Sequence, residues 1–174
     1  DALDRELQAR RPHPLLGTAS LHASTVAGGH ELSSYPDRCH LQMERRTIPG
    51  EPPGVAAREV EKILASLRAA DPHFLAHSRS MFARSSHELA ADHALPVALL
   101  RALAAPAAPA APAAPVPIGM SFWTDAAILG EAGIPSILFG PTGAGLHSID
   151  EWVDTASVLA CRDALTALAR EWCR

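Results

Sequence analysis

The chain has 174 residues, 48% of them hydrophobic, which suits one globular domain of ordinary size or two small units. Its net charge is −4 with histidine neutral, and its basic residues are scattered, which argues against a nucleic-acid partner. No apolar run approaches the ~18 residues of a membrane span and no signal peptide is evident, so we expect a cytoplasmic protein with no membrane partner. The three cysteines have no C-x-x-C spacing and are expected to be free thiols.

The N-terminal part predicts one helix and two strands. Residues 1–11 carry a helical mixture of charges but no preceding N-cap, so we expect the second half of a helix, which Pro12 ends. Residues 19–26 alternate as in a strand, and a second strand follows Pro36. A glycine-bearing connection predicts that the two strands form an antiparallel pair. The second strand places three apolar residues on one face: Cys39, Leu41 and Met43.

Residues 44–51, ERRTIPGE, predict a Pro-Gly turn that closes the second strand. A helix follows Gly54 and stops at Asp71-Pro72, and a strand is expected from Phe74 to Phe82. The helix has an apolar stripe of Val60, Ile63, Leu64 and Leu67. This order of elements makes residues 1–84 an incomplete α+β sandwich.

Residues 85–174 predict the end of an α/β domain. The pattern is helical over residues 85–103, whereas the Ala-Ala-Pro repeats in the 104–117 loop cannot stay helical and are assigned no function. The last helix, residues 155–172, is expected to belong to the core. Its apolar stripe comprises Val158, Cys161, Leu165, Leu168 and Trp172.

The stretch from Gly119 to Val153 reads GMSFWTDAAILGEAGIPSILFGPTGAGLHSIDEWV. Its apolar run Ile134–Phe139 has the length and bulk of a buried strand, and the following Gly-Pro loop carries His147. Ligands of open α/β sheets bind at the carboxyl ends of strands, which favours a functional His147. A single histidine in a loop is nevertheless more often without a catalytic role, and spacing alone leaves both interpretations open.

The stretch resembles part of one metallohydrolase family. The resemblance lies in the order of its motifs: Thr-Asp-Ala, a helix, Gly-Ile-Pro, a strand, Phe-Gly-Pro, a Gly-rich loop and His-Ser-Ile-Asp-Glu. This is the family of zinc aminoacylase, acetylornithine deacetylase, succinyl-diaminopimelate desuccinylase and carboxypeptidase G. The resemblance implies an α/β protein containing the lid and the end of the catalytic domain. It also implies that His147 binds one of two zinc ions, with cobalt or manganese as alternatives. Asp150 or Glu151 is expected to orient its imidazole ring.

The turn at residues 44–51 resembles the Asp-x-Arg-x-x-Pro-Gly-Glu motif of the same family's lid, with Glu44 in place of the Asp. In some members this Arg binds a substrate carboxylate in the partner subunit's active site. The resemblance therefore implies a substrate-binding Arg46 and a homodimer formed through the lid. A guanidinium suits this role because its planar fork donates two hydrogen bonds to a carboxylate. The alternative is a solvated Arg46 in a surface charge cluster.

Two further positions are expected to bind substrate. Thr124 matches a position beside the family's substrate-binding backbone, and Gly143 and Gly145 allow main-chain amides to approach an anion closely. The alternative is that Thr124 and Asp125 cap the next helix. We assign Asp125 to the cap and leave Thr124 open.

The family's other metal-binding motifs are absent from this sequence, which has no His-x-Asp and no Glu-Glu. Zinc sites need three or four protein ligands, so His147 cannot hold a metal alone, and we expect no catalytic residue in this chain. Two hypotheses follow. The first is the C-terminal part of a metal-dependent hydrolase of amide bonds in N-acyl amino acids or small peptides, inactive by itself. The second is a non-enzymatic dimerisation or binding module.

Overall fold

The computed structural model describes residues 2–104 and 115–173 of the chain and divides into two compact units. The first unit comprises Asp1–Ser86 with Gly119–Trp123, and the second comprises His87–Ile118 with Thr124–Arg174. Helices and small antiparallel sheets occur in both, which agrees with the expected α/β class. The sandwich arrangement expected for residues 1–84 stays a prediction.

The first unit has a small apolar core at its N-terminal helix. Helix α1 (Ala2–Gln8) buries Leu3 and Leu7 against Ala19, and Leu21 and Ile48 pack at the margin. Leu7 is completely buried. The leucines lie four residues apart and therefore on one face of the helix, which explains why this short helix packs inward on a single side.

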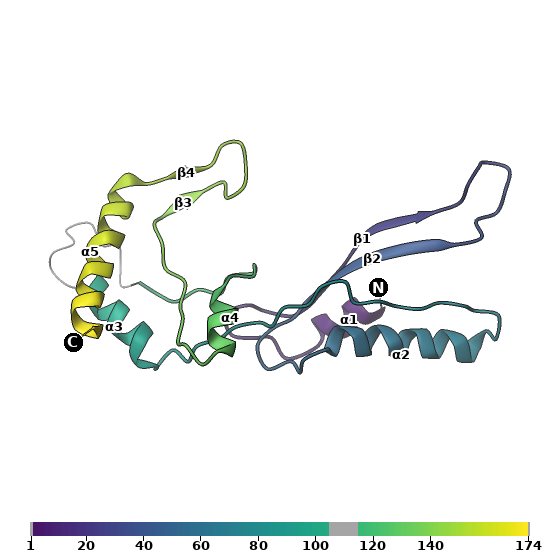
Figure 1. The fold of residues 1–174 in the computed structure, drawn as a ribbon, viewed down its shortest axis with the longest axis horizontal. Helices are drawn as coiled ribbons and strands as arrows, with labels where there is room; N and C mark the ends of the chain where they lie inside the picture. The colour runs from purple at the N-terminus through teal and green to yellow at the C-terminus, as the bar shows by residue number, and fades with distance from the viewer. Residues whose placement is uncertain (1, 105–114, 174) are drawn as a thin grey trace. The chain divides into compact units, whose positions relative to one another are not determined.

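Strands β1 (Ser20–Gly28) and β2 (Cys39–Arg46) form the predicted antiparallel pair, a hairpin visible in Figure 1. The register runs from Ser20 opposite Arg46 to Gly28 opposite Cys39, with a bulge between Ala23 and Thr25. Both strands are largely exposed, and the sheet has only these two strands. Isolated two-stranded hairpins are marginally stable, so this hairpin depends on the core below it.

Helix α2 (Val55–Ala70) ends at Asp71, as predicted, and its N-cap Gly54 has a φ of 72°. The strand predicted at Phe74–Phe82 is wrong, because this segment has no regular secondary structure and pairs with no strand in the described part of the chain. It runs back along α2 (Figure 1), where side chains hold it. Ser78 Oγ donates to Glu61 Oε1 at 2.6 Å, and Arg68 donates to the carbonyl of Ala76 at 2.5 Å. Helix side chains have thus taken the place of a β-ladder.

The second unit contains helix α3 (Ala94–Leu103) packed against helix α5 (Thr155–Trp172) (Figure 1). An Arg101–Glu171 ion pair of 2.5 Å links the two helices. The helix predicted over residues 85–103 begins only at Ala94. His93 caps it there, with Nδ1 accepting a hydrogen bond from the Leu95 amide at 3.1 Å. Residues 105–114 of the predicted 104–117 loop lie outside the described residues.

Helix α5 has the predicted bounds, but its apolar stripe is core only in part. Ala164 is buried and Cys161 half-buried, whereas Val158, Leu165 and Trp172 are exposed. The reason is that α3 covers only one side of α5. Burial also raises the pKa of the Cys161 thiol above its usual value.

The strand predicted at Ile134–Phe139 is also wrong. The segment follows the short helix α4 (Ala126–Glu131) and is extended, but no strand in the described part of the chain pairs with it. Ile134 and Leu138 are about half exposed. An apolar run becomes a strand only where a second backbone satisfies its amides, and the described residues provide none here. A small hairpin of β3 (Gly143–Ala144) and β4 (Trp152–Val153) follows instead.

Candidate functional site

His147 lies in the loop between β3 and β4, in a left-handed backbone conformation that is uncommon for residues other than glycine. The Ser148 amide donates to the carbonyl of Gly145 at 2.7 Å and closes a turn around His147, whose φ is 64°. Among the described residues it is the only non-glycine with a positive φ. This conformation costs an L-residue about 1 kcal/mol or more, and such strain clusters at functional sites. The geometry therefore favours a functional His147.

The two glycines of the same loop have clear folding roles. A Cβ on Gly143 would collide with the carbonyl of Trp152 on the paired strand. At Gly145, φ is 75° and a Cβ would lie 2.7 Å from the carbonyl of Asp150. Both positions need glycine for the hairpin to close around His147. Their expected contact with an anionic substrate stays a prediction.

The imidazole of His147 is exposed, and within residues 2–104 and 115–173 it has no hydrogen bond to Asp150 or Glu151. The same residues contain no group of three or more His, Cys, Asp or Glu side chains able to hold a metal ion. The described residues therefore do not by themselves fit a metal ion, and the metal-binding role of His147 stays a prediction.

Thr124 lines a hollow of about 490 Å³ in the second unit, between the starts of α3 and α4 and the extended segment before Gly140. The hollow is mostly apolar, and its lining comprises Leu95, Thr124, Asp125, Ala126, Leu129 and residues 135–138. Asp125 occupies the N-cap of α4, as expected, but its side chain makes no capping hydrogen bond. The backbone carbonyl of Thr124 accepts from the Ala127 amide at 3.1 Å, and within the described residues no hydrogen bond engages its hydroxyl. Gly143 and Gly145 do not line this hollow.

Arg46 lies at the end of β2, where the predicted Pro-Gly turn begins. The Glu51 amide donates to the carbonyl of Ile48 at 3.3 Å, and Gly50 has the positive φ, 88°, that the third position of a type II turn requires. The Arg46 side chain is 51% exposed. Its Nε donates to Glu44 at 2.5 Å and its Nη1 to the carbonyl of Ser121 at 3.4 Å.

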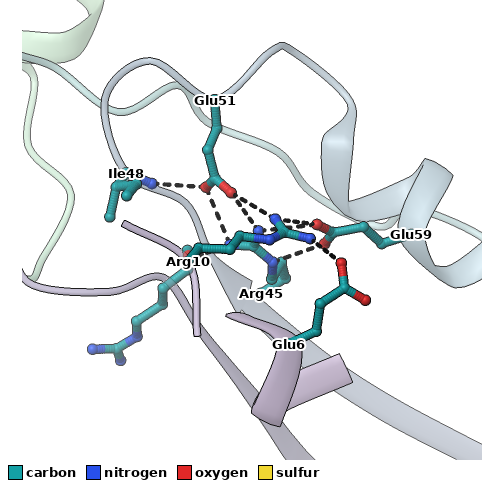
Figure 2. A network of polar contacts seen from close by, with 7 residues as sticks. Glu6, Arg10, Arg45, Ile48, Glu51 and Glu59 are labelled. Atoms are coloured by element: carbon teal, nitrogen blue, oxygen red, sulfur yellow. Dashed lines mark hydrogen bonds and ion pairs between the residues drawn. The ribbon is translucent and has the colours of Figure 1, made fainter. Parts of the chain in front are cut away.

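The residue before it, Arg45, points to the opposite face of the strand into an ion-paired network that we call the Arg45 cluster. Figure 2 shows its members, Glu6, Arg10, Arg45, Glu51 and Glu59. Burial opposes the charged forms of Arg45 and Glu59, but their hydrogen bonds prevail, so the pKa of Arg45 is raised and that of Glu59 lowered. This cluster was not predicted from the sequence. One sequence feature indicated it: Arg45 falls on the same face of the strand as the apolar residues Leu41 and Met43, where a charged residue needs a partner.

Two other histidines hold parts of the second unit in place. His93 caps α3. His87 Nε2 donates to the carbonyl of Ser136 at 2.8 Å, and its ring lies so close to Gly130 that a Cβ there would collide with Nδ1. His87 thereby fastens the segment before α3 to the end of α4.

Comparison with known proteins establishes the family. The model of peptidase family M20/M25/M40 matches residues 40–171, and the chain belongs to this family. The chain is 26% identical over 155 residues to the acetylornithine deacetylase of Myxococcus xanthus, an alignment that covers 88% of this chain and 38% of that protein. It is 27% identical over 171 residues to the N-formyl-4-amino-5-aminomethyl-2-methylpyrimidine deformylase of Halalkalibacterium halodurans. This alignment covers 90% of this chain and 39% of that protein.

The resemblance inferred from the two motifs is thereby confirmed at the level of the family. The chain spans about two fifths of the length of these relatives. No solved structure matches the chain. No helix in the described ranges is long and apolar enough to cross a membrane.

Proposed function

We propose that this chain is the C-terminal part of a metal-dependent hydrolase that cleaves amide bonds of N-acyl amino acids or small peptides. The observation that carries the proposal is the family match over residues 40–171. The names of both relatives describe removal of an acyl group, acetyl in one and formyl in the other. The shared chemistry is hydrolysis of a bond between an acyl carbon and nitrogen.

In this proposal His147 contributes one imidazole to a two-zinc site, with cobalt or manganese as alternative metals. The other ligands come from parts of a longer protein that this chain does not span, so the 174-residue chain is inactive alone. A bound metal ion would supply a water of lowered pKa as nucleophile. The residues of this chain hold the imidazole in place through the turn that Gly145 and Ser148 close.

Arg46 and Thr124 are the proposed substrate-binding side chains. The exposed guanidinium of Arg46 matches the fork geometry of a carboxylate, which every free amino acid carries. Thr124 contributes a hydroxyl to a mostly apolar hollow that has room for an acyl group. If Thr124 binds substrate, Thr124→Ala should raise KM in the longer enzyme. If Thr124 has only a structural role, the same substitution should leave KM unchanged and lower Tm.

A homodimer formed through the first unit is the accompanying proposal. It is supported by the two outer edges of the β1–β2 hairpin, which pair with no other strand in the described residues, and by exposed apolar side chains at Val26 and Leu41. Sedimentation velocity tests it: the wild-type chain should sediment as a dimer, and Leu41→Lys should sediment as a monomer. A monomeric wild-type chain would contradict the proposal.

The decisive experiment uses the longer protein that contains this chain and compares His147→Ala with His93→Ala. The first should lower the bound zinc toward one ion per site and nearly abolish turnover of N-acetyl amino acids, with Tm unchanged. His93→Ala removes a helix cap and should lower Tm while leaving the zinc content intact. A His147→Ala enzyme with two zinc ions and normal turnover would refute the metal role. Turnover by the isolated 174-residue chain would refute its predicted inactivity.

A further inference from the structure

Two consecutive arginines at the end of β2 have opposite environments. Side chains alternate between the faces of a strand, so Arg45 and Arg46 must point in opposite directions. The side chain of Arg45 is 5% exposed, whereas that of Arg46 is 51% exposed. One guanidinium is therefore fixed inside the unit while the other faces solvent.

The inner guanidinium is fully engaged by two carboxylates. Arg45 Nη2 donates to Glu51 Oε1 at 2.6 Å, and Arg45 Nε donates to Glu59 Oε2 at 2.9 Å. Arg10 Nη1 donates to the same Glu59 side chain at 2.8 Å (Figure 2). Because Glu59 lies on α2, these contacts tie β2 to α2 and to the end of α1.

The same cluster also holds the backbone that follows Arg46. Arg45 Nη1 donates to the carbonyl oxygen of Arg46 at 2.6 Å, which fixes the peptide that follows Arg46. Glu51 Oε2 accepts from the Ile48 amide at 3.0 Å and closes the next turn. Hydrogen bonds to charged groups are stronger than neutral ones and so are well suited to restrain a strand end.

The Arg46 guanidinium itself is lightly held. Its bond to Glu44 is exposed, its bond to the Ser121 carbonyl is long, and within the described residues its Nη2 makes no hydrogen bond. A carboxylate can bind this guanidinium at Nη2 and replace one of the two exposed contacts, and the fixed backbone leaves little conformational entropy to lose on binding.

We infer that Arg45, Glu51 and Glu59 are positioning residues for Arg46: their ion pairs fix the end of β2 and thereby hold the Arg46 guanidinium where it binds a carboxylate. This inference rests on the proposed carboxylate-binding role of Arg46. In this inference Glu51, which ends the Pro-Gly-Glu turn, helps to orient Arg46, five residues earlier in the chain.

The first experiment needs no ligand. In the ¹⁵N-labelled 174-residue chain, the heteronuclear NOE of the Arg46 Nε–Hε group reports how rigidly this side chain is held. Arg45→Lys keeps the charge but loses the fork, and Glu59→Gln keeps the shape but loses the charge; both should lower the NOE. Leu3→Val is the matched control, since it weakens the core of the same unit by about 1 kcal/mol without touching the Arg45 cluster.

The second experiment titrates N-acetylglycine into the longer protein that contains this chain, with the same substitutions, well below the lowest Tm. We expect Arg45→Lys and Glu59→Gln to raise Kd about tenfold, which corresponds to about 1.4 kcal/mol, and Leu3→Val to leave it unchanged. Arg46→Gln should abolish binding with little change in Tm.

The outcomes distinguish the positioning role of Arg45, Glu51 and Glu59 from the carboxylate-binding role of Arg46. An unchanged NOE in Arg45→Lys and Glu59→Gln, or an equal loss in Leu3→Val, overturns the positioning role. An Arg46→Gln variant that binds N-acetylglycine as the wild type does refutes the carboxylate-binding role instead, whatever the NOE shows. A lowered NOE confined to the two cluster variants, with the matching rise in Kd, supports the inference.

Discussion

The turn after β2 and the loop between β3 and β4 each present one side chain to solvent, but they hold it by different means. At the first, Arg46 is backed by the buried Arg45 cluster. At the second, His147 is held by a strained φ and a hairpin of two residue pairs. Charged contacts thus fix the first site, whereas backbone conformation fixes the second. The two sites should therefore respond to different perturbations.

The largest expected effect comes from removing the centre of the Arg45 cluster. Arg45→Ala leaves the carboxylates of Glu51 and Glu59, each mostly buried, without their main partner. Breaking a buried pair in this way should cost about 3 kcal/mol of the free energy of unfolding. Urea denaturation of the first unit measures it, and Arg46→Ala is the control that should cost less than about 1 kcal/mol. Equal losses in the two variants would show that burial does not separate these arginines.

The second prediction concerns the stability of the first unit at low pH. The pKa of Glu59 is lowered in the folded chain, since its hydrogen bonds from Arg45 and Arg10 outweigh burial. A depressed carboxyl pKa means that the stabilisation is complete above the ordinary Glu pKa and is lost as pH falls below it. The first unit should therefore lose stability below about pH 4.5, and Glu59→Gln should flatten this dependence. Tm measured against pH for both proteins is the test, and parallel curves would contradict it.

Much of the first unit could be predicted because its signals are local. Alternation gave β1 and β2, the Pro-Gly pair gave the turn, and Asp71-Pro72 gave the end of α2. The family, too, followed from short motifs around Arg46 and His147. These features depend on a few neighbouring residues, which a sequence displays directly.

The errors arose where structure depends on distant partners. The apolar run at Ile134–Phe139 has strand composition, but a strand also needs a neighbouring backbone. The stripe on α5 has helical spacing, but α3 covers only one side of it. The Arg45 cluster joins residues from α1, β2, the turn and α2, and no single local pattern reveals that pairing.

A smaller effect is expected at the His147 loop. Gly145→Ala places a Cβ at a φ of 75°, next to the carbonyl of Asp150 and the hydroxyl of Ser148. The β3–β4 hairpin should lose about 2 kcal/mol, because strain and collision both act there. Hydrogen exchange at the Asp154 amide, which donates to Thr142 at 2.8 Å, should become faster. The Glu51 amide in the first unit is the internal control, and its exchange rate should stay unchanged.

The smallest effect is a gain in stability at His147 itself. Its φ of 64° suits glycine, so His147→Gly should be about 1 kcal/mol more stable in this hairpin than His147→Ala. The Ala variant is the proper reference, since both substitutions remove the imidazole and only one keeps the Cβ. Slower exchange of the Ser148 amide in the Gly variant would measure the relief, because that amide closes the turn around residue 147. Equal exchange in the two variants would mean that the loop stores no strain at this position. A measured gain would show that the chain keeps a histidine where glycine folds better, as expected if the imidazole is retained for binding a metal ion.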